Sequence, residues 1–386
     1  MNLLLHPHAL FIVVFLLFGL ITVLVNNHTV RRFDQYPTTQ STTHVSILVP
    51  ARNEELNIET CVTSLMRQNY PDYDVIVLDD HSTDQTRNIL SRLSIQYKNL
   101  QILDGQSLPE GWLGKHWACH QLGMAATGEL LLFVDADTRH SPDMLLDSVS
   151  ALQAELADLI SAFPREEVVT LGERLLVPVI GFGIFTFIPL RLVQRMRLAA
   201  LSVTIGQFML FRRAAYDAVG GYKAVRGEIV DDMVLGRRVI TSGLEWRLMD
   251  GTNHVFCRMY RGFWETVEGF SKNLFAVFDY RILPYFFGWT LVGIAFIEPA
   301  VALLSHWLRT PLTSIPPGYA AISVILSVIL WTIAYRRFKF PPYLVCYYPL
   351  SLALFIAVAI RSFIQTATGT ATWKDRLLNR VAIRWL

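Results

Sequence analysis

Residues 130–137 read Leu-Leu-Leu-Phe-Val-Asp-Ala-Asp, a short apolar run that ends in two carboxylates. A run of this length, rich in residues that fit a pleated sheet, predicts a buried β-strand. In open α/β sheets, ligands bind beyond the carboxyl ends of the strands, where Asp135 and Asp137 are expected to lie. Two carboxylates that flank one residue can share a hard divalent cation, which prefers oxygen ligands. The stretch therefore predicts a central strand with a cation site at its end.

Two further carboxylate pairs stand in the polar middle of the chain. Asp79 and Asp80 follow the apolar run 75–78, and Asp231 and Asp232 come about a hundred residues after Asp135. Adjacent carboxylates raise each other's pKa, which suits a general base that works near neutral pH. If the three clusters converge, they predict a metal-assisted enzyme of diphosphate chemistry.

Strand-like and helix-like segments alternate from residue 45 onward. Strands are expected at 45–49, 75–78, 101–103 and 130–134, and helices at 55–68, 83–97 and 115–126. This alternation predicts βαβ units, hence an α/β domain with a mostly parallel sheet and helices on both faces. No Gly-x-Gly-x-x-Gly motif follows the first strand, which argues against a dinucleotide-binding oxidoreductase.

The two ends of the chain are strongly apolar. Hydrophobic residues make up 52% of the sequence. Residues 10–25 carry no charge, and three later runs, 283–304, 318–334 and 343–360, approach the length of a membrane span. A cleaved signal peptide is the alternative for the first run, but it lacks a basic start and a small-residue cleavage site. Buried core helices are the alternative for the later runs. We expect an integral membrane protein.

Basic residues indicate the orientation. Arg31 and Arg32 directly follow the first run, which places the polar middle on the cytoplasmic side. Basic residues after the run 318–334 and in the carboxy-terminal tail favour the same side. Simple crossings cannot satisfy all of them, so one late run is expected to be re-entrant or interfacial. The expected domains are an anchor (1–30), a cytoplasmic catalytic domain (31–282), a membrane region (283–366) and a basic cytoplasmic tail (367–386).

Two further features bear on partners and on the membrane. The formal net charge of +2 gives no electrostatic case for nucleic acid, and the four scattered cysteines favour a reducing compartment.

Residues 175–192 form another apolar stretch. They are interpreted as an interfacial segment that guides a lipid towards the site, with a buried core helix as the open alternative.

Five motifs in order resemble the family 2 glycosyltransferases of GT-A fold, over roughly residues 45–272. They are Val-Pro-Ala-Arg-Asn-Glu-Glu (49–55), Leu-Asp-Asp-His-Ser-Thr-Asp (78–84), Gly-Lys (114–115), Phe-Val-Asp-Ala-Asp (133–137) and the segment 206–222. The apolar flanks resemble the lipid-modifying branch of the family, which includes hopanoid-associated, carotenoid (diaponeurosporenoate- or myxol-type) and ceramide glycosyltransferases. The tail segment 372–376 resembles the Trp-basic-x-Arg element of that branch.

The resemblance implies roles for the first two motifs. In the family, the positions of Pro50, Arg52, Asn53 and Glu54 contact the base and ribose of the nucleotide. Asp79 and Asp80 would accept hydrogen bonds from the same groups. From the residues alone, Arg-Asn-Glu after a strand is more often a solvated turn. The aspartates could also form a capping turn before the next helix, which is compatible with contacts to a ligand.

For the diphosphate, the resemblance implies that Asp137 holds Mg²⁺ or Mn²⁺, with Asp135 supporting the ribose or the metal. A cation there would stabilise the charge of the leaving group. Lys115 would reach the diphosphate, although a surface lysine is the open alternative.

For the chemical step, the order of motifs places Asp232 at the family's catalytic base, with Asp231 beside it. An Asp-rich helix start is the alternative. Arg258 and Arg261 match the Gln/Arg-x-x-Arg-Trp element, whose arginine clamps the diphosphate, although interfacial arginines are an alternative. Gly262 stands where that element has Trp, and Trp264 lies two residues on. The missing Trp argues for transfer of a single sugar.

The prediction is therefore a membrane-bound, inverting, metal-dependent glycosyltransferase. Its expected partners are a nucleotide-diphosphate sugar, UDP-hexose first, and a lipid acceptor such as a carotenoid or hopanoid. A processive polysaccharide synthase is one alternative. The other is a membrane protein that binds a nucleotide without catalysis.

Overall fold

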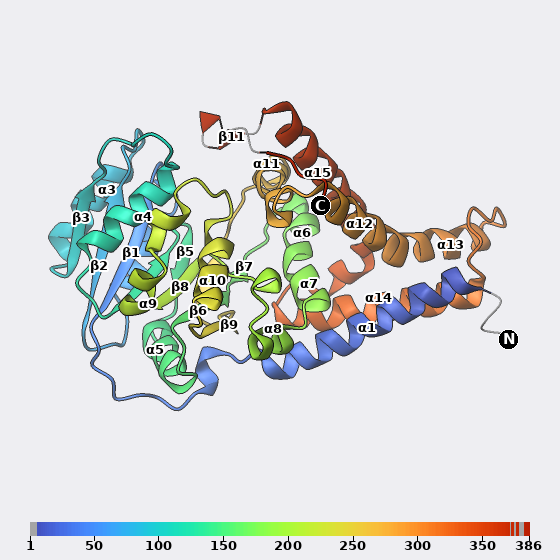
Figure 1. Cartoon of the computed structure of the whole chain (residues 1–386), viewed down its shortest axis with the longest axis horizontal. Coiled ribbons are helices and arrows are strands. Elements are labelled where there is room, and N and C mark those ends of the chain that lie inside the picture. The colour runs from blue at the N-terminus through green and yellow to red at the C-terminus, as the bar shows by residue number, and fades with distance from the viewer. Residues whose placement is uncertain (1–5, 371, 374–375, 378–381) are drawn as a thin grey trace. The chain divides into compact units, whose positions relative to one another are not determined.

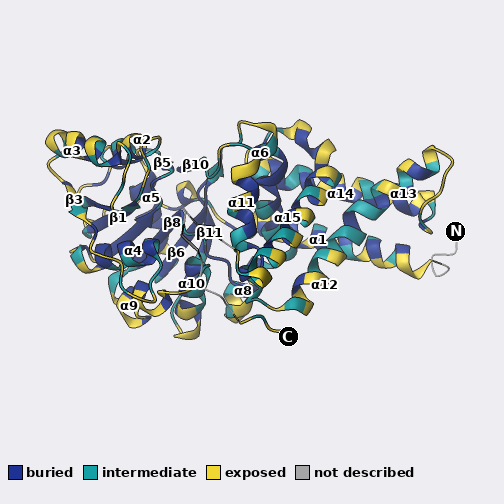
Figure 2. Cartoon of the chain, turned by 90° about the horizontal axis from the view of Figure 1, so that it is seen from above, coloured by how far each residue is buried: buried dark blue, intermediate teal, exposed yellow. Residues whose placement is uncertain are grey.

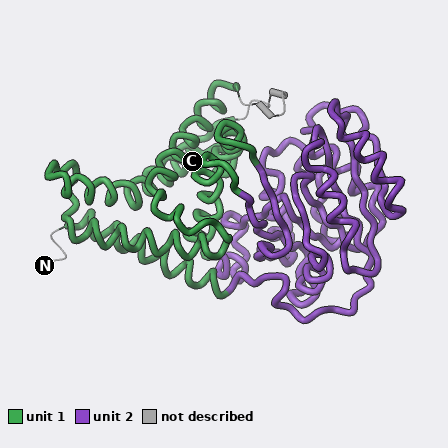
Figure 3. The backbone as a smooth tube through the Cα atoms, turned by 180° about the vertical axis from the view of Figure 1, so that it is seen from behind, with its two compact units in different colours: residues 1–28, 168–189, 260–386 green, residues 29–167, 190–259 purple. Residues whose placement is uncertain are grey.

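The chain folds into two units, each assembled from segments that lie far apart in the sequence (Figure 3). The computed structural model describes residues 6–370, 372–373, 376–377 and 382–386. The sheet unit comprises Thr29–Glu167 and Leu190–Met259, and the helical unit comprises Met1–His28, Val168–Pro189 and Tyr260–Leu386. The domain boundaries expected from the sequence, at residues 30, 282 and 366, concern the membrane and stay a prediction.

A seven-stranded sheet forms the centre of the sheet unit (Figure 1). Its spatial order is β3-β2-β1-β4-β8-β6-β9. The pairs β1–β2, β2–β3, β1–β4 and β6–β9 are parallel, and β8 runs antiparallel to β4 and β6. The strands are β1 (Val45–Ala51), β2 (Tyr73–Asp79), β3 (Leu100–Asp104), β4 (Leu130–Val134), β6 (Leu159–Phe163), β8 (Phe208–Arg212) and β9 (Trp246–Asp250). The predicted α/β class and mostly parallel sheet are confirmed.

The central strands are buried on both faces (Figure 2), which explains why they read as continuous apolar runs. On one face, Val45, Ile47 and Val49 of β1 belong to a core that includes residues of α2, α3 and α5. On the other face, Phe133 of β4 stacks on Tyr216 of α9, with ring centroids 5.4 Å apart. The helices of this unit are α2 (Ile58–Leu65), α3 (Thr86–Gln96), α4 (Gly114–Ala125), α5 (Met144–Ala154), α8 (Leu190–Met196), α9 (Arg213–Ala218) and α10 (Asp231–Thr241).

Three short strands form a second sheet beyond β4. Its order is β5 (Thr138–His140), β10 (Val255–Cys257) and β7 (Arg165–Glu166). Cys257 is opposite Thr138 on one side and opposite Glu166 on the other. The small sheet therefore brings segments from three parts of the chain next to the end of β4.

The helical unit is built mainly from apolar helices. Within the described residues, four helices are long and apolar enough to cross a membrane: Pro7–Thr29, Ile282–Trp307, Pro317–Arg337 and Pro342–Thr368. The elements are α1 (Pro7–Thr29), α6 (Leu171–Leu176), α7 (Pro178–Phe187), α11 (Phe263–Asn273), α12 (Ile282–Val292), α13 (Glu298–Trp307), α14 (Pro317–Arg337) and α15 (Tyr348–Thr368), with a two-stranded pair β11 (Thr372–Trp373) and β12 (Arg376–Leu377). A π-helical turn, Gly293–Ile297, interrupts the second candidate span directly before Glu298, where Glu298-Pro299 predicts a broken helix.

The apolar stretch 175–192 is divided between α6, α7 and α8 in the structure. Asn26 of α1 donates hydrogen bonds of 2.8 Å to the carbonyls of Phe185 and Ile188. Phe182 stacks on Trp331 of α14 with centroids 3.8 Å apart. One side of α7 is therefore packed inside the helical unit, and its role at a membrane interface stays a prediction. In the tail motif, Lys374 and Asp375 lie outside the described residues.

Candidate active site

The carboxyl ends of β2, β1 and β4 lie side by side at one edge of the large sheet. These three strands are neighbours and parallel, and Ala51 at the end of β1 is paired with Asp79 at the end of β2. Residues 52–54, 79–80 and 135–137 directly follow or end these strands. The fold therefore gathers the first two motif groups and the Asp135–Asp137 pair along one edge, as the strand pattern predicts.

The segments after β1 and β2 are joined by hydrogen bonds. The Arg52 guanidinium donates to the Asp80 carbonyl at 2.7 Å and lies 3.5 Å from the Asp80 carboxylate. Asn53 has a φ of 53°, a conformation that asparagine tolerates better than most residues. Its side-chain oxygen accepts from the Thr83 N–H at 2.8 Å. These bonds fix the shape of the edge before any ligand arrives.

The other residues of the first two motifs differ in their burial and hydrogen bonds. Asp79 and Asp80 are both buried, and Asp79 accepts a hydrogen bond from the Ser82 N–H at 3.2 Å. Asp79 therefore holds the turn after β2 and does not cap α3, which begins at Thr86 without a side-chain cap. Pro50 lies within β1 opposite Leu78. The Glu54 N–H donates to the Thr86 hydroxyl at 2.8 Å, which fixes the turn where Glu54 lies.

Lys115 connects the Asp135 group to the Asp231 group. Its ammonium nitrogen lies 2.5 Å from Asp135 Oδ1. Burial disfavours the charge of this lysine, but the carboxylates of Asp135 and Asp231 outweigh that effect and raise its pKa well above the usual value. Lys115 is therefore charged and paired with Asp135, and its contact with a diphosphate stays a prediction.

Asp137 carries an unsatisfied buried oxygen. Its Oδ1 is buried and has no hydrogen-bond partner among the residues that the structure describes. Burial, with the nearby carboxylates of Asp135 and Glu54, raises the pKa of Asp137 to about 7. A carboxylate with a buried, unpaired oxygen is a group that a cation would stabilise strongly.

Asp231 and Asp232 begin α10 and have opposite electrostatic surroundings. Asp231 Oδ1 lies 3.3 Å from His116 Nε2. Although burial opposes ionisation of Asp231, His116 and Lys115 hold its pKa well below the usual range. Burial and the neighbouring Asp231 charge instead raise the pKa of Asp232 to about 7. One carboxylate of the pair is thus permanently charged, and the other titrates near neutrality.

Backbone groups hold the Asp232 carboxylate in place. The Gly206 N–H donates to its Oδ2 at 2.9 Å, and the Met233 N–H donates to its Oδ1 at 2.7 Å. A Cβ added to Gly206 would lie 3.2 Å from Oδ2, so a side chain there would crowd the carboxylate. The segment 206–222 is therefore joined to the acidic pair through the backbone of Gly206.

The two arginines after β10 belong to different units. Arg258 is in the sheet unit, and Arg261 is in the helical unit. Gly262, next to Arg261, has a φ of +98°, and its N–H donates to Glu173 Oε1 at 2.7 Å. This conformation favours glycine and would strain a side chain such as Trp at this position. Trp264 is 68% exposed.

Sequence reasoning missed four residues that contact this site. Gln207 donates to Glu166 Oε1 at 3.3 Å and lies 3.9 Å from Cys257 Sγ. Burial and the Asp137 charge raise the pKa of Glu166 well above its usual value. With His116, these residues surround the aspartates. The only sequence signal for Glu166 was its place after an apolar run, since its neighbours come from distant segments.

The site fits a divalent cation only with help from a ligand. In the described part of the chain, no three His, Cys, Asp or Glu side chains are arranged to hold a metal by themselves. Asp135 is paired with Lys115, whereas Asp137 Oδ1 has no hydrogen-bond partner in the described part of the chain. Mg²⁺ and Mn²⁺ often take one or two carboxylates together with phosphate oxygens and water. The residues present match that pattern.

Comparison with known proteins finds the same fold, and part of the chain matches the same family. Residues 46–220 match the family described as "Glycosyl transferase family 2". The 4,4'-diaponeurosporenoate glycosyltransferase of Staphylococcus haemolyticus is 25% identical over 260 residues, which cover 65% of this chain and 66% of that protein. The enzyme of the same name from Staphylococcus aureus (strain USA300) is 26% identical, covering 86% and 87%.

Another relative is also named for a lipid. The beta-monoglucosyldiacylglycerol synthase of Nostoc sp. is 32% identical over 203 residues, and the alignment covers 50% of this chain but only 41% of that protein. Among solved structures, the mannosyltransferase PcManGT from Pyrobaculum calidifontis, in complex with GDP-Man and Mn²⁺, has a TM-score of 0.54 at 17% identity, covering 94% of this chain and 98% of that one. This likeness shows the fold.

Proposed function

Since residues 46–220 form a family 2 glycosyltransferase domain, we propose that this chain is a membrane-bound inverting enzyme that moves a single sugar from a nucleotide-diphosphate donor to a lipid acceptor. The observation that carries the proposal is the position of Lys115. It is paired with Asp135 and lies within electrostatic reach of Asp231. The residues proposed to bind the sugar donor and the residues proposed to supply the base therefore belong to one site.

The donor would lie along the carboxyl edge of the large sheet. Pro50, Arg52, Asn53, Glu54, Asp79 and Asp80 would contact its base and ribose. Lys115 would offer positive charge to the diphosphate, with Arg258 and Arg261 as further candidates. A cation held by Asp137 and supported by Asp135 would neutralise the charge of the nucleotide diphosphate. UDP-hexose is the first donor to assay.

Asp232 would remove the proton from the acceptor hydroxyl as the oxygen attacks the anomeric carbon. Its two backbone hydrogen bonds hold both carboxylate oxygens in place. Asp231 would act on Asp232 through its permanent negative charge, which keeps the pKa of Asp232 high. A single base is sufficient for an inverting displacement, and no covalent intermediate is required.

The acceptor is proposed to be a lipid for two reasons. The relatives above are named for a carotenoid acid and for a glucosyl diacylglycerol. Four apolar helices long enough to span a bilayer accompany the sheet unit in one chain. We propose a carotenoid, hopanoid or similar apolar acceptor, reached from a catalytic domain on the cytoplasmic side.

The product test concerns the number of sugars transferred. Cells that express the chain should accumulate a lipid that is heavier by one hexose, because Gly262 leaves no Trp at the position of the acceptor platform used by processive synthases. Lipid extracts from cells with and without the gene should be compared by mass spectrometry. A ladder of added hexoses would favour a processive synthase, and unchanged lipid profiles with intact expression would contradict a lipid acceptor.

The pH test follows from the pKa of Asp232. Because that pKa is raised to about 7, the ionised base becomes scarcer below pH 7 by about tenfold per pH unit. At saturating donor and cation, kcat should rise with pH and level off above about 7. A kcat that is flat through this range, or that falls, would contradict the assignment of Asp232 as the base.

A further inference from the structure

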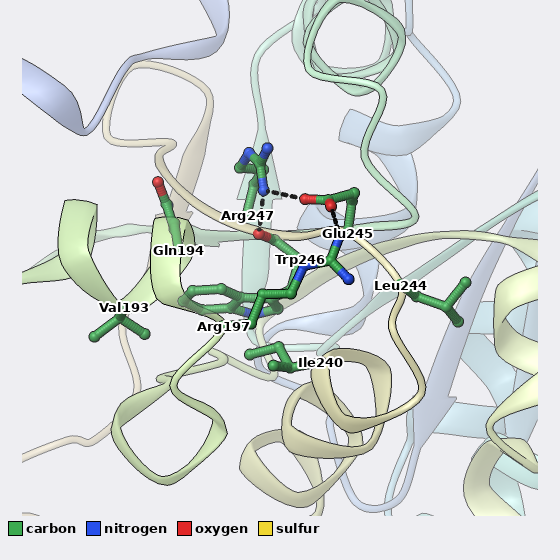
Figure 4. Close-up of a pocket in the computed structure, with 8 residues that line it drawn as sticks. All are labelled: Val193, Gln194, Arg197, Ile240, Leu244, Glu245, Trp246 and Arg247. Atoms are coloured by element: carbon green, nitrogen blue, oxygen red, sulfur yellow. Dashed lines mark hydrogen bonds and ion pairs between the residues drawn. The ribbon is translucent and has the colours of Figure 1, made fainter.

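A basic hollow lies on the sheet unit away from the carboxylate site. Its volume is about 440 Å³, and it is formed by α8 together with α5 and the start of β9. Figure 4 shows a smaller pocket that shares Gln194, Arg197, Glu245 and Arg247 with this hollow; in it Glu245 lies between Arg197 and Arg247. The charged residues that line the hollow are Arg191, Arg195, Arg197, Arg247, Glu155 and Glu245.

Both glutamates of the hollow are already paired. Arg247 lies 3.0 Å from Glu155 and 2.9 Å from Glu245. Glu245 also pairs with Arg197, whose guanidinium donates to the Gly243 carbonyl at 2.8 Å. These contacts form a rigid base in which the carboxylate charges are neutralised by two of the four arginines.

Arg191 and Arg195 leave two positive charges without a counterion. They stand four residues apart on α8, so they lie on the same face of the helix. Both are exposed, and neither forms an ion pair with any carboxylate that the structure describes. Two uncompensated guanidinium groups at the rim of a hollow are suited to a phosphate, which arginine binds with two parallel hydrogen bonds.

An apolar row runs beside the basic row on α8. Leu192 is 46% exposed and Met196 is 59% exposed, and they too stand four residues apart. Leu201, after the helix, is also 46% exposed. A pocket for a soluble anion has no need of this exposed apolar surface. A helix that lies in a membrane interface needs both rows, one for head groups and one for acyl chains.

Helix α8 follows the apolar helix α7 along the chain after a short link. Helix α7 ends at Phe187 and contains no charged residue, and α8 begins at Leu190. Three residues of extended chain span about 10 Å. If α7 lies in or against a bilayer, α8 is therefore held within reach of the head groups.

We propose that α8 and its hollow form a binding site for an anionic phospholipid. Arg191 and Arg195 bind the head-group phosphate, and Leu192 and Met196 enter the boundary of the acyl chains. The site would hold the catalytic unit against the leaflet that contains the acceptor. This inference rests on the membrane association in the proposed function, and it is independent of the sugar-transfer chemistry.

Lipid binding by the full chain in a neutral detergent tests the inference. Native mass spectrometry should detect dioleoylphosphatidylglycerol binding with a clear preference over dioleoylphosphatidylcholine. The double variant Arg191→Gln/Arg195→Gln should weaken phosphatidylglycerol binding by about 30-fold, which corresponds to ~2 kcal/mol, or about 1 kcal/mol for each arginine near an anionic head group. The double Lys variant should retain most of the binding, since it keeps both charges.

Two controls distinguish a lipid site on α8 from a general charge effect and from a site for soluble anions. The variant Arg67→Gln/Lys98→Gln removes two exposed positive charges elsewhere on the sheet unit and should leave the affinity unchanged; an equal loss would mean a general charge effect and overturn the proposal. Soluble glycerol 1-phosphate should bind far more weakly than the lipid, and equal affinity would indicate a soluble anion instead. The variant Leu192→Ser/Met196→Ser should weaken binding of the lipid but not binding of soluble glycerol 1-phosphate. Lost sugar transfer with intact lipid preference would contradict only the proposed function.

Discussion

Replacing Asp232 with Asn should lower kcat for sugar transfer by about a thousandfold, because a positioned general base contributes roughly 10²–10⁴ to the rate. The amide cannot accept the acceptor proton, although it occupies the same volume. Donor affinity should stay within a few-fold of the wild-type value. Radiolabelled sugar transfer at saturating donor measures the first quantity, and calorimetric titration with the nucleotide measures the second.

A matched substitution shows whether the loss is specific to Asp232. Asp217 is exposed on α9, and Asp217→Asn removes one carboxylate charge from the same unit. That variant should transfer sugar at the wild-type rate. Asn at position 232 loses one of the two backbone hydrogen bonds of the carboxylate, which costs about 1 kcal/mol of folding free energy. Wild-type turnover in a folded Asp232→Asn protein would reject the base assignment.

Replacing Asp137 with Ala should weaken nucleotide-diphosphate binding in the presence of Mn²⁺ by about a hundredfold, since even loss of a group that supports a metal ligand typically costs about 10–100-fold in metal affinity. The reason is the buried, unpaired Oδ1, which a cation would satisfy. Calorimetric titration of UDP into the full chain, with Mn²⁺ and then with EDTA, measures the effect. Wild-type binding should fall in EDTA, whereas the variant should be weak under both conditions.

The control for this prediction is an exposed aspartate close in sequence. Asp143 lies just before α5 and accepts a hydrogen bond from Asn69 at 2.7 Å. Asp143→Ala should therefore leave cation-dependent binding intact. If the wild-type chain binds UDP with equal affinity in Mn²⁺ and in EDTA, the proposed cation role of Asp137 fails regardless of what the variant does.

The strand pattern predicted the carboxyl edge of the sheet correctly because it depends on local sequence. The apolar run before Asp135 and the one before Asp79 both form buried strands close to the expected limits. Parallel strands end at the same edge, so their terminal residues must lie side by side whatever the details of packing. The same reasoning predicted the four apolar helices, whose length and hydropathy are also local properties.

Contacts between segments that lie far apart in the chain could not be predicted from the sequence. Lys115 could be assigned either to a ligand or to solvent until the fold placed it beside Asp135. Glu166 joined the site only because β7 pairs with β10, which brings it opposite Cys257. The lack of Trp at position 262 was visible in the sequence, but the positive φ of Gly262 before α11 was not.

By itself, the sequence determined the class of fold, the order of the acidic motifs and the apolar character of both ends, because strand, turn and helix preferences act over a few neighbouring residues. Only the tertiary structure decided which carboxylate is paired, which is left with a buried unsatisfied oxygen, and which titrates near neutrality. Those properties depend on burial and on charges a few ångströms away in space, and the groups that supply them come from segments scattered along the chain.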